Sequence, residues 1–149
     1  MLKYQQRFVD KMLDHSLEYG NVLYDMDNET AVTPEWGKYW ARHIRERGES
    51  VYTKVHTTEM WDPWDLRHKK HKATFEHPEL YTFVDISQNN HISDPEHYDN
   101  AMYARKATRK PPRPINSIKI YGADTGRYGS TRDGVGRFWQ NIFAGLASV

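Results

Sequence analysis

The chain has 149 residues, which is enough for one domain with a hydrophobic core. Its formal net charge of +1 at pH 7 excludes the strongly basic surface of a nonspecific nucleic-acid or anionic-lipid binder. It has no cysteine, which excludes disulfides, thiolate zinc sites and a cysteine nucleophile. No apolar run reaches the roughly 20 residues of a membrane span, and no signal peptide is visible at Met1. We therefore expect one domain, residues 1–149, without nucleic-acid or membrane partners.

The chain alternates helical and extended patterns. Residues 2–19 carry two adjacent apolar stripes at a spacing of four residues, which predicts an amphipathic helix. Residues 21–26 follow as a short apolar strand that runs directly into Asp27-Asn28-Glu29. A helix over 34–48 then begins with a capping threonine, a proline and an acid.

The second half of the chain repeats this rhythm. Its predicted elements are, in order, a strand at 51–55 that ends at His56, a loop at 57–77, a strand at 81–87 that runs into Gln88 and Asn89, a helix from 94, a strand at 115–121, a helix from 130 or 133, and the start of a strand at 147–149. The last helix has the cleanest apolar stripe. Trp36, Trp40 and Trp139 lie on helical stripes, and we expect them to be core.

Alternating strands and helices predict a parallel sheet with right-handed crossovers. Each predicted strand ends in polar residues, a pattern typical of a (β/α)8 barrel or of an open doubly wound sheet. The glycine-rich stretch 122–129 lacks the phosphate-binding spacings, which argues against nucleotide use. A complete barrel needs about 250 residues. We therefore expect an α/β chain that forms part of a longer barrel.

Glu29 is the principal candidate for chemistry. A glutamate at the carboxyl end of a buried strand can serve as a general acid whose pKa is raised by burial, and the amide of Asn28 can hold a substrate hydroxyl. The alternative is a solvated acid in the approach to a helix.

The Asn28-Glu29 pair resembles the Asn-Glu pair that closes the fourth strand of retaining (β/α)8-barrel glycoside hydrolases of the cellulase-like clan. The surrounding sequence is similar to that of the apiosidase-like members of that group. The similar stretches are Phe8-Val9-Asp10-Lys11, Asn21-Val22-Leu23-Tyr24 with Asp27-Asn28-Glu29, Trp36-Gly37-Lys38-Tyr39-Trp40, Val84-Asp85-Ile86-Ser87-Gln88, Lys119-Ile120-Tyr121-Gly122 and Arg137-Phe138-Trp139-Gln140-Asn141.

The resemblance implies that the chain covers the C-terminal part of a TIM barrel, from about strand four to strand eight, with Glu29 as acid/base. It also implies a parent protein that is secreted or periplasmic. A retaining enzyme needs a second carboxylate about 5–5.5 Å from the first. The matching strand here ends in Ile118-Lys119-Ile120-Tyr121 and has no glutamate. Asp124 is the nearest acid and the preferred partner, while Asp27 and Asp85 are alternatives.

The remaining strand-end residues are candidates for substrate binding. They are Asn28, His56, Trp61, Gln88, Asn89 and Tyr121. Trp61 and Trp64 can form a sugar-stacking platform or can fill the core. His56, His91 and His97 with Asp85 can be considered as metal ligands, but their spacing matches no metal motif, and we expect no metal and no cofactor. We interpret the basic run 68–72 as a solvated loop.

These observations favour a glycoside hydrolase that acts on an oligosaccharide or polysaccharide. A second hypothesis is a glycan-binding barrel without a working nucleophile. A third is a different α/β protein whose strand-end acids bind a small polar ligand. The open edges of an incomplete barrel also predict self-association.

Overall fold

The computed structural model describes residues 1–122 and 129–148. Its elements, in order, are α1 (Leu2–Ser16), β1 (Leu23–Asn28), α2 (Pro34–Ser50), β2 (His56–Met60), α3 (Lys69–Phe75), β3 (Val84–Asp85), the 3-10 helix η1 (Ser87–His91), α4 (Glu96–Ala107), β4 (Ile115–Asn116) and α5 (Thr131–Phe143). Among these residues no helix is long and apolar enough to cross a membrane.

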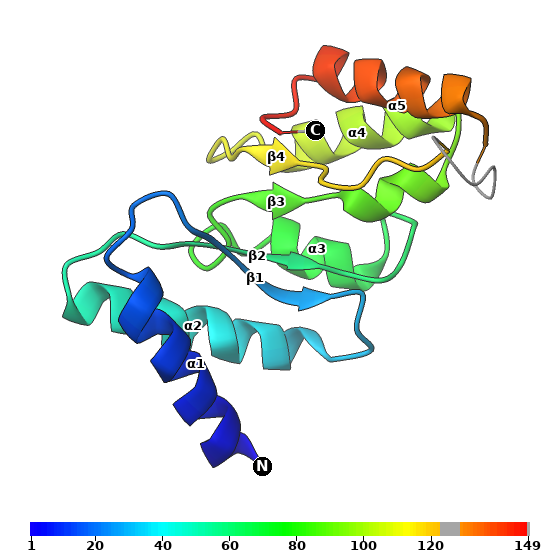
Figure 1. Ribbon diagram of the computed structural model, residues 1–149. Coiled ribbons are helices and arrows are strands. Elements are labelled where there is room, and N and C mark those ends of the chain that lie inside the picture. The colour runs from blue at the N-terminus through cyan, green and yellow to red at the C-terminus, as the bar shows by residue number, and fades with distance from the viewer. Residues whose placement is uncertain (123–128, 149) are drawn as a thin grey trace.

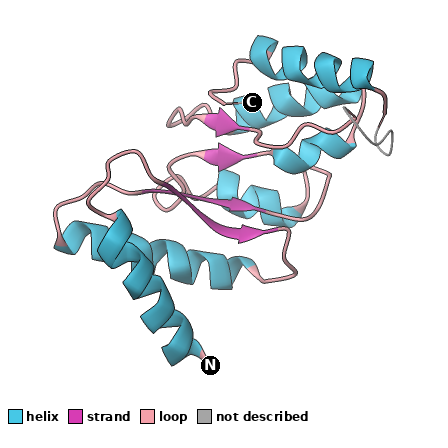
Figure 2. Cartoon of the chain, viewed as in Figure 1, coloured by secondary structure: helices cyan, strands magenta, loops and turns pink. Residues whose placement is uncertain are grey.

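The strands are parallel and lie in chain order. β1 pairs with β2 from Leu23 opposite His56, and β3 pairs with β4 from Val84 opposite Ile115. A backbone hydrogen bond of 3.1 Å, from Thr82 N–H to Thr57 O, connects the segments of β2 and β3. All four arrows point the same way in Figure 2. The result is two small parallel sheets in sequence order.

Beyond β4 a further segment runs parallel to it. Ser148 bridges Asn116, and the Ala147 amide donates to Ile115 O over 2.7 Å. This agrees with the strand start predicted at 147–149 as far as residue 148. The partial barrel itself remains a prediction, because a short parallel arc is compatible with a barrel and with an open sheet.

The apolar core forms where helices cover the strands. Tyr24 and Met26 of β1 pack on a cluster from α1, α2 and the residue before β2, which consists of Leu13, Leu17, Ile44 and Val55. A second cluster joins β3 and β4 to α3 and α4, and it includes Val84, Ile86, Ala101 and Ile115. Figure 1 shows α1 and α2 at the β1 end of the molecule, and α4 and α5 at the β4 end.

Several predicted strand boundaries are wrong. The strand predicted at 51–55 is a turn and an extended segment, because α2 continues to Ser50 and Tyr52 then takes a left-handed backbone with φ 59°. The strand at this point is β2, which begins at His56 and continues into the predicted loop 57–77. That segment also contains α3, so the basic run 68–72 lies largely on a helix, with His71 buried, and is not a solvated loop. The strands predicted at 81–87 and 115–121 are each reduced to two residues.

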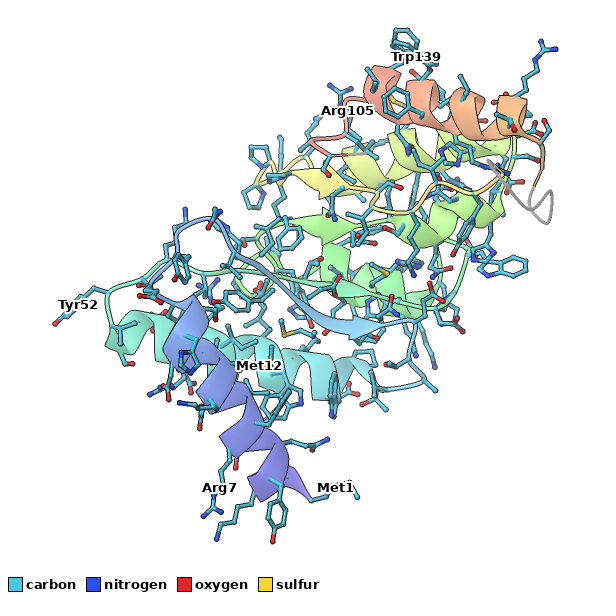
Figure 3. All side chains as sticks on the ribbon, in the orientation of Figure 1. Met1, Arg7, Met12, Tyr52, Arg105 and Trp139 are labelled. Atoms are coloured by element: carbon cyan, nitrogen blue, oxygen red, sulfur yellow. The ribbon has the colours of Figure 1, made fainter. Side chains whose placement is uncertain are left out.

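Two of the predicted apolar stripes face solvent, and one of them carries Trp139, which was predicted to be core. On α1 the exposed members are Tyr4, Phe8 and Met12, and on α5 they are Val135, Phe138, Trp139, Ile142 and Phe143. Trp139 is 50% exposed and projects away from the sheet in Figure 3. Trp40 is buried, as predicted. The helical periodicity was correct, but no element of the described chain covers these two faces.

Candidate functional site

The carboxyl end of β1 meets the segment that follows β4. The Lys119 ammonium forms an ion pair with Glu29 Oε1 and donates a hydrogen bond of 3.0 Å to Asn28 Oδ1. Because a neighbouring cation favours the charged form of a carboxyl group, this contact holds Glu29 as a carboxylate. The sequence pattern identified Glu29 and Asn28, but not the lysine that binds both.

The Glu29 backbone adopts a left-handed conformation with φ 57°. Non-glycine residues seldom adopt this region, and doing so costs on the order of 1 kcal/mol or more. Tertiary contacts hold it there, because the Glu29 amide donates to Met60 O over 2.9 Å while its side chain pairs with Lys119. The strained residue turns the chain at the end of β1 and points the carboxylate toward the segment after β4.

Asp25, on β1, provides a second carboxyl group besides that of Glu29. Burial raises its pKa to about 8, and the charges of Asp85 and Asp27 contribute in the same direction. Asp25 is nevertheless exposed to solvent, so its carboxyl group is accessible to a substrate. Lys119 lies close enough for the Asp25 charge to act on the lysine pKa, which burial lowers.

Asp85 provides a third carboxyl group from β3. Burial raises its pKa to about 6, against the hydrogen bonds that stabilise its carboxylate. These bonds come from the Ser87 amide at 2.8 Å, the Ser87 hydroxyl at 3.0 Å and the Asn116 side-chain amide at 2.8 Å. Asp85 therefore links the ends of β3 and β4.

Glu59 of β2 is fully buried and was not identified from the sequence. Burial raises its pKa to about 10, and its hydrogen bond with the Asp27 side chain contributes in the same direction. At neutral pH Glu59 is therefore protonated and donates to Asp27, while the Tyr81 hydroxyl donates to Glu59 Oε1 over 2.9 Å. Asp27 also accepts from the Met60 amide at 3.1 Å and the Thr30 hydroxyl at 2.9 Å. This network fixes the ends of β1 and β2.

The structure separates two of the predicted binding residues from the strand-end face. His56 begins β2, so it lies at the opposite end of that strand from Glu29, and its ring contacts the Thr82 hydroxyl at 3.0 Å. Trp61 has 0% exposure, and its indole N–H donates to the Thr74 hydroxyl over 2.8 Å. The Trp61 ring therefore fills the core and offers no face to a sugar.

Other predicted residues lie after the strands as expected. Gln88 and Asn89 are buried in η1, where Asn89 donates to His97 O over 2.8 Å. Both polar atoms of the Gln88 amide are buried without a hydrogen-bond partner among the described residues. Tyr121 packs edge-on against His91, with ring centroids 4.9 Å apart. Asp124 lies outside the described residues.

Trp64 provides the exposed aromatic ring that Trp61 does not. It is 51% exposed and stacks on His91 with ring centroids 4.6 Å apart and an interplanar angle of 7°. Trp64, His91 and Tyr121 follow three different strands at their carboxyl ends. The Asp-Pro that precedes Trp64 indicates an exposed loop and was the available signal for choosing it over Trp61.

Among the described residues, the histidines considered as metal ligands do not gather at one site. His97 is buried, with one ring nitrogen 3.0 Å from Asn89 O and the other 2.9 Å from Asn141 Oδ1, and burial lowers its pKa. Within residues 1–122 and 129–148 no group of three or more histidines or acids is arranged to hold a metal ion.

Comparison with protein-family models, curated proteins and solved structures found no significant match to this chain.

Proposed function

We propose that this chain is a carbohydrate-active domain that hydrolyses glycosidic bonds at the carboxyl ends of its strands. The observation that supports the proposal is a pair of carboxyl groups in opposite environments, Asp25 on β1 and Glu29 directly after this strand. Lys119 favours the ionised form of Glu29, whereas burial and nearby acids favour the protonated form of Asp25. Divergent environments of this kind are how glycosidases assign a base and an acid to two carboxyl groups.

In this proposal Asp25 gives its proton to the leaving oxygen, and Glu29 takes a proton from the attacking water. The proton donor in this proposal is Asp25 and not Glu29, which the resemblance implied as the acid/base. Asp124 has no role in it. Asn28 holds a sugar hydroxyl, and Trp64 stacks on a pyranose face. The stack of Trp64 on His91 supports this role because one ring face is already braced by protein.

A second candidate is glycan binding without catalysis. Lys119 engages both Glu29 and Asn28, so the two groups that would act on a substrate already have a partner. A substrate hydroxyl that displaced Lys119 would expose the carboxylate to the sugar, whereas a persistent ion pair would leave only a polar binding surface.

Hydrolysis of a panel of aryl glycosides tests the two candidates. Wild type should release the aryl group, and Glu29→Gln and Asp25→Asn should each lower kcat by about 100-fold or more, in the range of lost acid–base catalysis. Glu46→Gln, an exposed acid on α2, is the matched control and should keep wild-type activity. Inactive wild type that still binds glycans in calorimetry would support the second candidate. Absence of both hydrolysis and binding would exclude both.

A further inference from the structure

A histidine lies between a lysine and a glutamate that come from separate parts of the chain. Lys38 belongs to α2, while His77 and Glu79 lie in the segment between α3 and β3. The Lys38 ammonium is 2.8 Å from His77 Nε2, and His77 Nδ1 is 2.7 Å from Glu79 Oε1. The three side chains therefore form one chain of hydrogen bonds with the imidazole in the middle. None of them has a role in the hydrolysis proposed above.

The two outer partners determine which ring nitrogen of His77 carries the proton. A lysine ammonium has only donors, so Nε2 accepts its hydrogen bond. A carboxylate only accepts, so Nδ1 carries the proton and donates to Glu79 Oε1. Against the effect of burial, this hydrogen bond lowers the pKa of Glu79, which keeps its carboxylate charged at neutral pH. The lone pair of Nε2 is thereby directed at the nitrogen of Lys38.

The backbone holds the lysine and the imidazole in these positions. The His77 carbonyl accepts hydrogen bonds of 3.0 Å from the amides of Leu80 and Tyr81, whose side chains are both buried. Lys38 directly follows Gly37, at which α2 packs closely on β2. Lys38 and His77 are themselves half-buried. The amine is therefore positioned by the protein and still open to a small reagent.

We propose that Lys38 is an acyl-acceptor site, at which the lysine amine takes an acyl group from a small acyl thioester. A nucleophile within hydrogen-bond reach of a base, with the base oriented by a third group, is the arrangement that activates side chains for attack on a carbonyl carbon. It is present here with an amine as the nucleophile, His77 as the base and Glu79 as the orienting group.

The proposed reaction replaces a carbon–sulfur bond with a carbon–nitrogen bond. His77 Nε2 takes a proton from the Lys38 ammonium, and the amine lone pair then attacks the thioester carbonyl carbon. The carbon–sulfur bond breaks and the thiolate leaves. The nitrogen loses two protons in all, of which one ends on the departing thiol and the other passes to solvent. Glu79 stabilises the imidazolium while His77 carries a proton.

Incubation of the full chain with acetyl-coenzyme A, followed by digestion and mass spectrometry, measures the acetylation rate of each lysine. Lys3 is the internal reference, because it is exposed on α1 and is more accessible than Lys38. Since general-base catalysis contributes about 100-fold or more, and Lys38 is the less exposed of the two, we expect Lys38 to react at least about tenfold faster than Lys3.

Substitutions separate this proposal from a purely structural role of the same hydrogen bonds. His77→Gln should lower the rate at Lys38 to that at Lys3, because glutamine accepts the hydrogen bond but takes up no proton. Glu79→Gln should give an intermediate rate, since the imidazolium loses its charged partner. His15→Gln, at an exposed histidine of α1, is the matched control and should leave the ratio of the two rates unchanged.

Circular dichroism of each variant checks that it is folded, and the rate at Lys3 should be the same in all of them. A structural role would change the stability of the variants without changing the ratio of the two rates. The proposal is overturned if Lys38 in the wild type reacts no faster than Lys3, or if folded His77→Gln and Glu79→Gln both keep the wild-type ratio.

Discussion

The contact between Glu29 and Lys119 joins residues 90 positions apart. Three local features combine there: a left-handed backbone at Glu29, an amide at Asn28 and an ammonium that contacts both side chains. Strained backbone at a strand end is often associated with function. The ion pair is only partly exposed, so solvent screens it less than a fully exposed surface pair. The contribution of such a surface pair to stability is typically below about 1 kcal/mol.

The buried proton of Glu59 predicts a pH dependence of stability. The pKa of Glu59 is about 10 in the folded protein, against an ordinary value of 4.5. Between these values the folded protein keeps a proton that the unfolded chain loses, so the free energy of unfolding falls as pH rises. For one such group the slope is about 1.4 kcal/mol per pH unit. We expect Glu59→Gln, which keeps a donor for Asp27 and an acceptor for Tyr81, to flatten this slope.

Thermal unfolding of wild type and Glu59→Gln across the range from mildly acidic to mildly alkaline pH measures the effect. The pKa values of Asp85 and Asp25 are raised to about 6 and about 8, so both contribute in the same direction at lower pH. Between the pKa of Asp25 and the pKa of Glu59, the slope of the free energy of unfolding against pH therefore reports mainly the proton of Glu59. Equal slopes for the two proteins in that interval would contradict a protonated Glu59. Glu46→Gln should retain the wild-type slope.

Trp64 gives a residue-scale prediction about ligand binding. A pyranose face packs well on the large flat surface of a tryptophan, and Trp64 presents one face while His91 supports the other. We expect Trp64→Ala to weaken glycan binding about tenfold, with Trp64→Phe intermediate, in a calorimetric titration with an oligosaccharide. Trp61→Phe is the contrasting change, because it should lower stability and leave affinity unchanged. Equal affinity of Trp64→Ala and wild type would exclude the stacking role.

At the scale of elements, the packing of α2 on β2 depends on Gly37. A Cβ atom at this position would lie 1.6 Å from Glu59 Oε1, so the helix can approach the buried carboxyl only with glycine there. Replacing an exposed helical glycine with alanine normally stabilises a protein by up to about 1 kcal/mol. We expect Gly37→Ala instead to destabilise it by about 2 kcal/mol or more, as overpacking does.

Gly136 on α5 is the matched control for that measurement. A Cβ atom there would have its nearest neighbour at 3.9 Å, which is ordinary contact. Urea unfolding should therefore show Gly136→Ala to be as stable as wild type or up to about 1 kcal/mol more stable. A stabilising Gly37→Ala would show that Glu59 is not held against α2.

At the scale of the whole molecule, the arc of parallel strands explains why polar groups and apolar faces lie where they do. The strand ends collect Asp25, Glu29 and Asp85 with Lys119 on one side of the sheet. The helices cover the strands laterally but leave one apolar face of α1 and one of α5 open at the two ends.

Local patterns were sufficient for much of the secondary structure. The stripes at 2–19 and after 130, and the threonine, proline and acid before Trp36, correctly predict α1, α5 and the start of α2, because such signals depend on neighbours within a turn or two. They also identify Asn28 and Glu29 as the end of a strand. The strand predicted at 51–55 failed because β-branched residues there follow a helix that overruns its expected end.

Which residues meet in space could be learned only from the folded chain. Lys119 reaches Glu29, and Glu59 finds Asp27 and Tyr81, through contacts across parallel strands that no local pattern encodes. The fold likewise makes Trp61 core while Trp64 and Trp139 face solvent, because burial depends on what packs against a side chain and not on its hydrophobicity. Local sequence specified most of the helices and the acid at the end of β1. The cation that pairs with that acid is brought to it by the fold from 90 residues away.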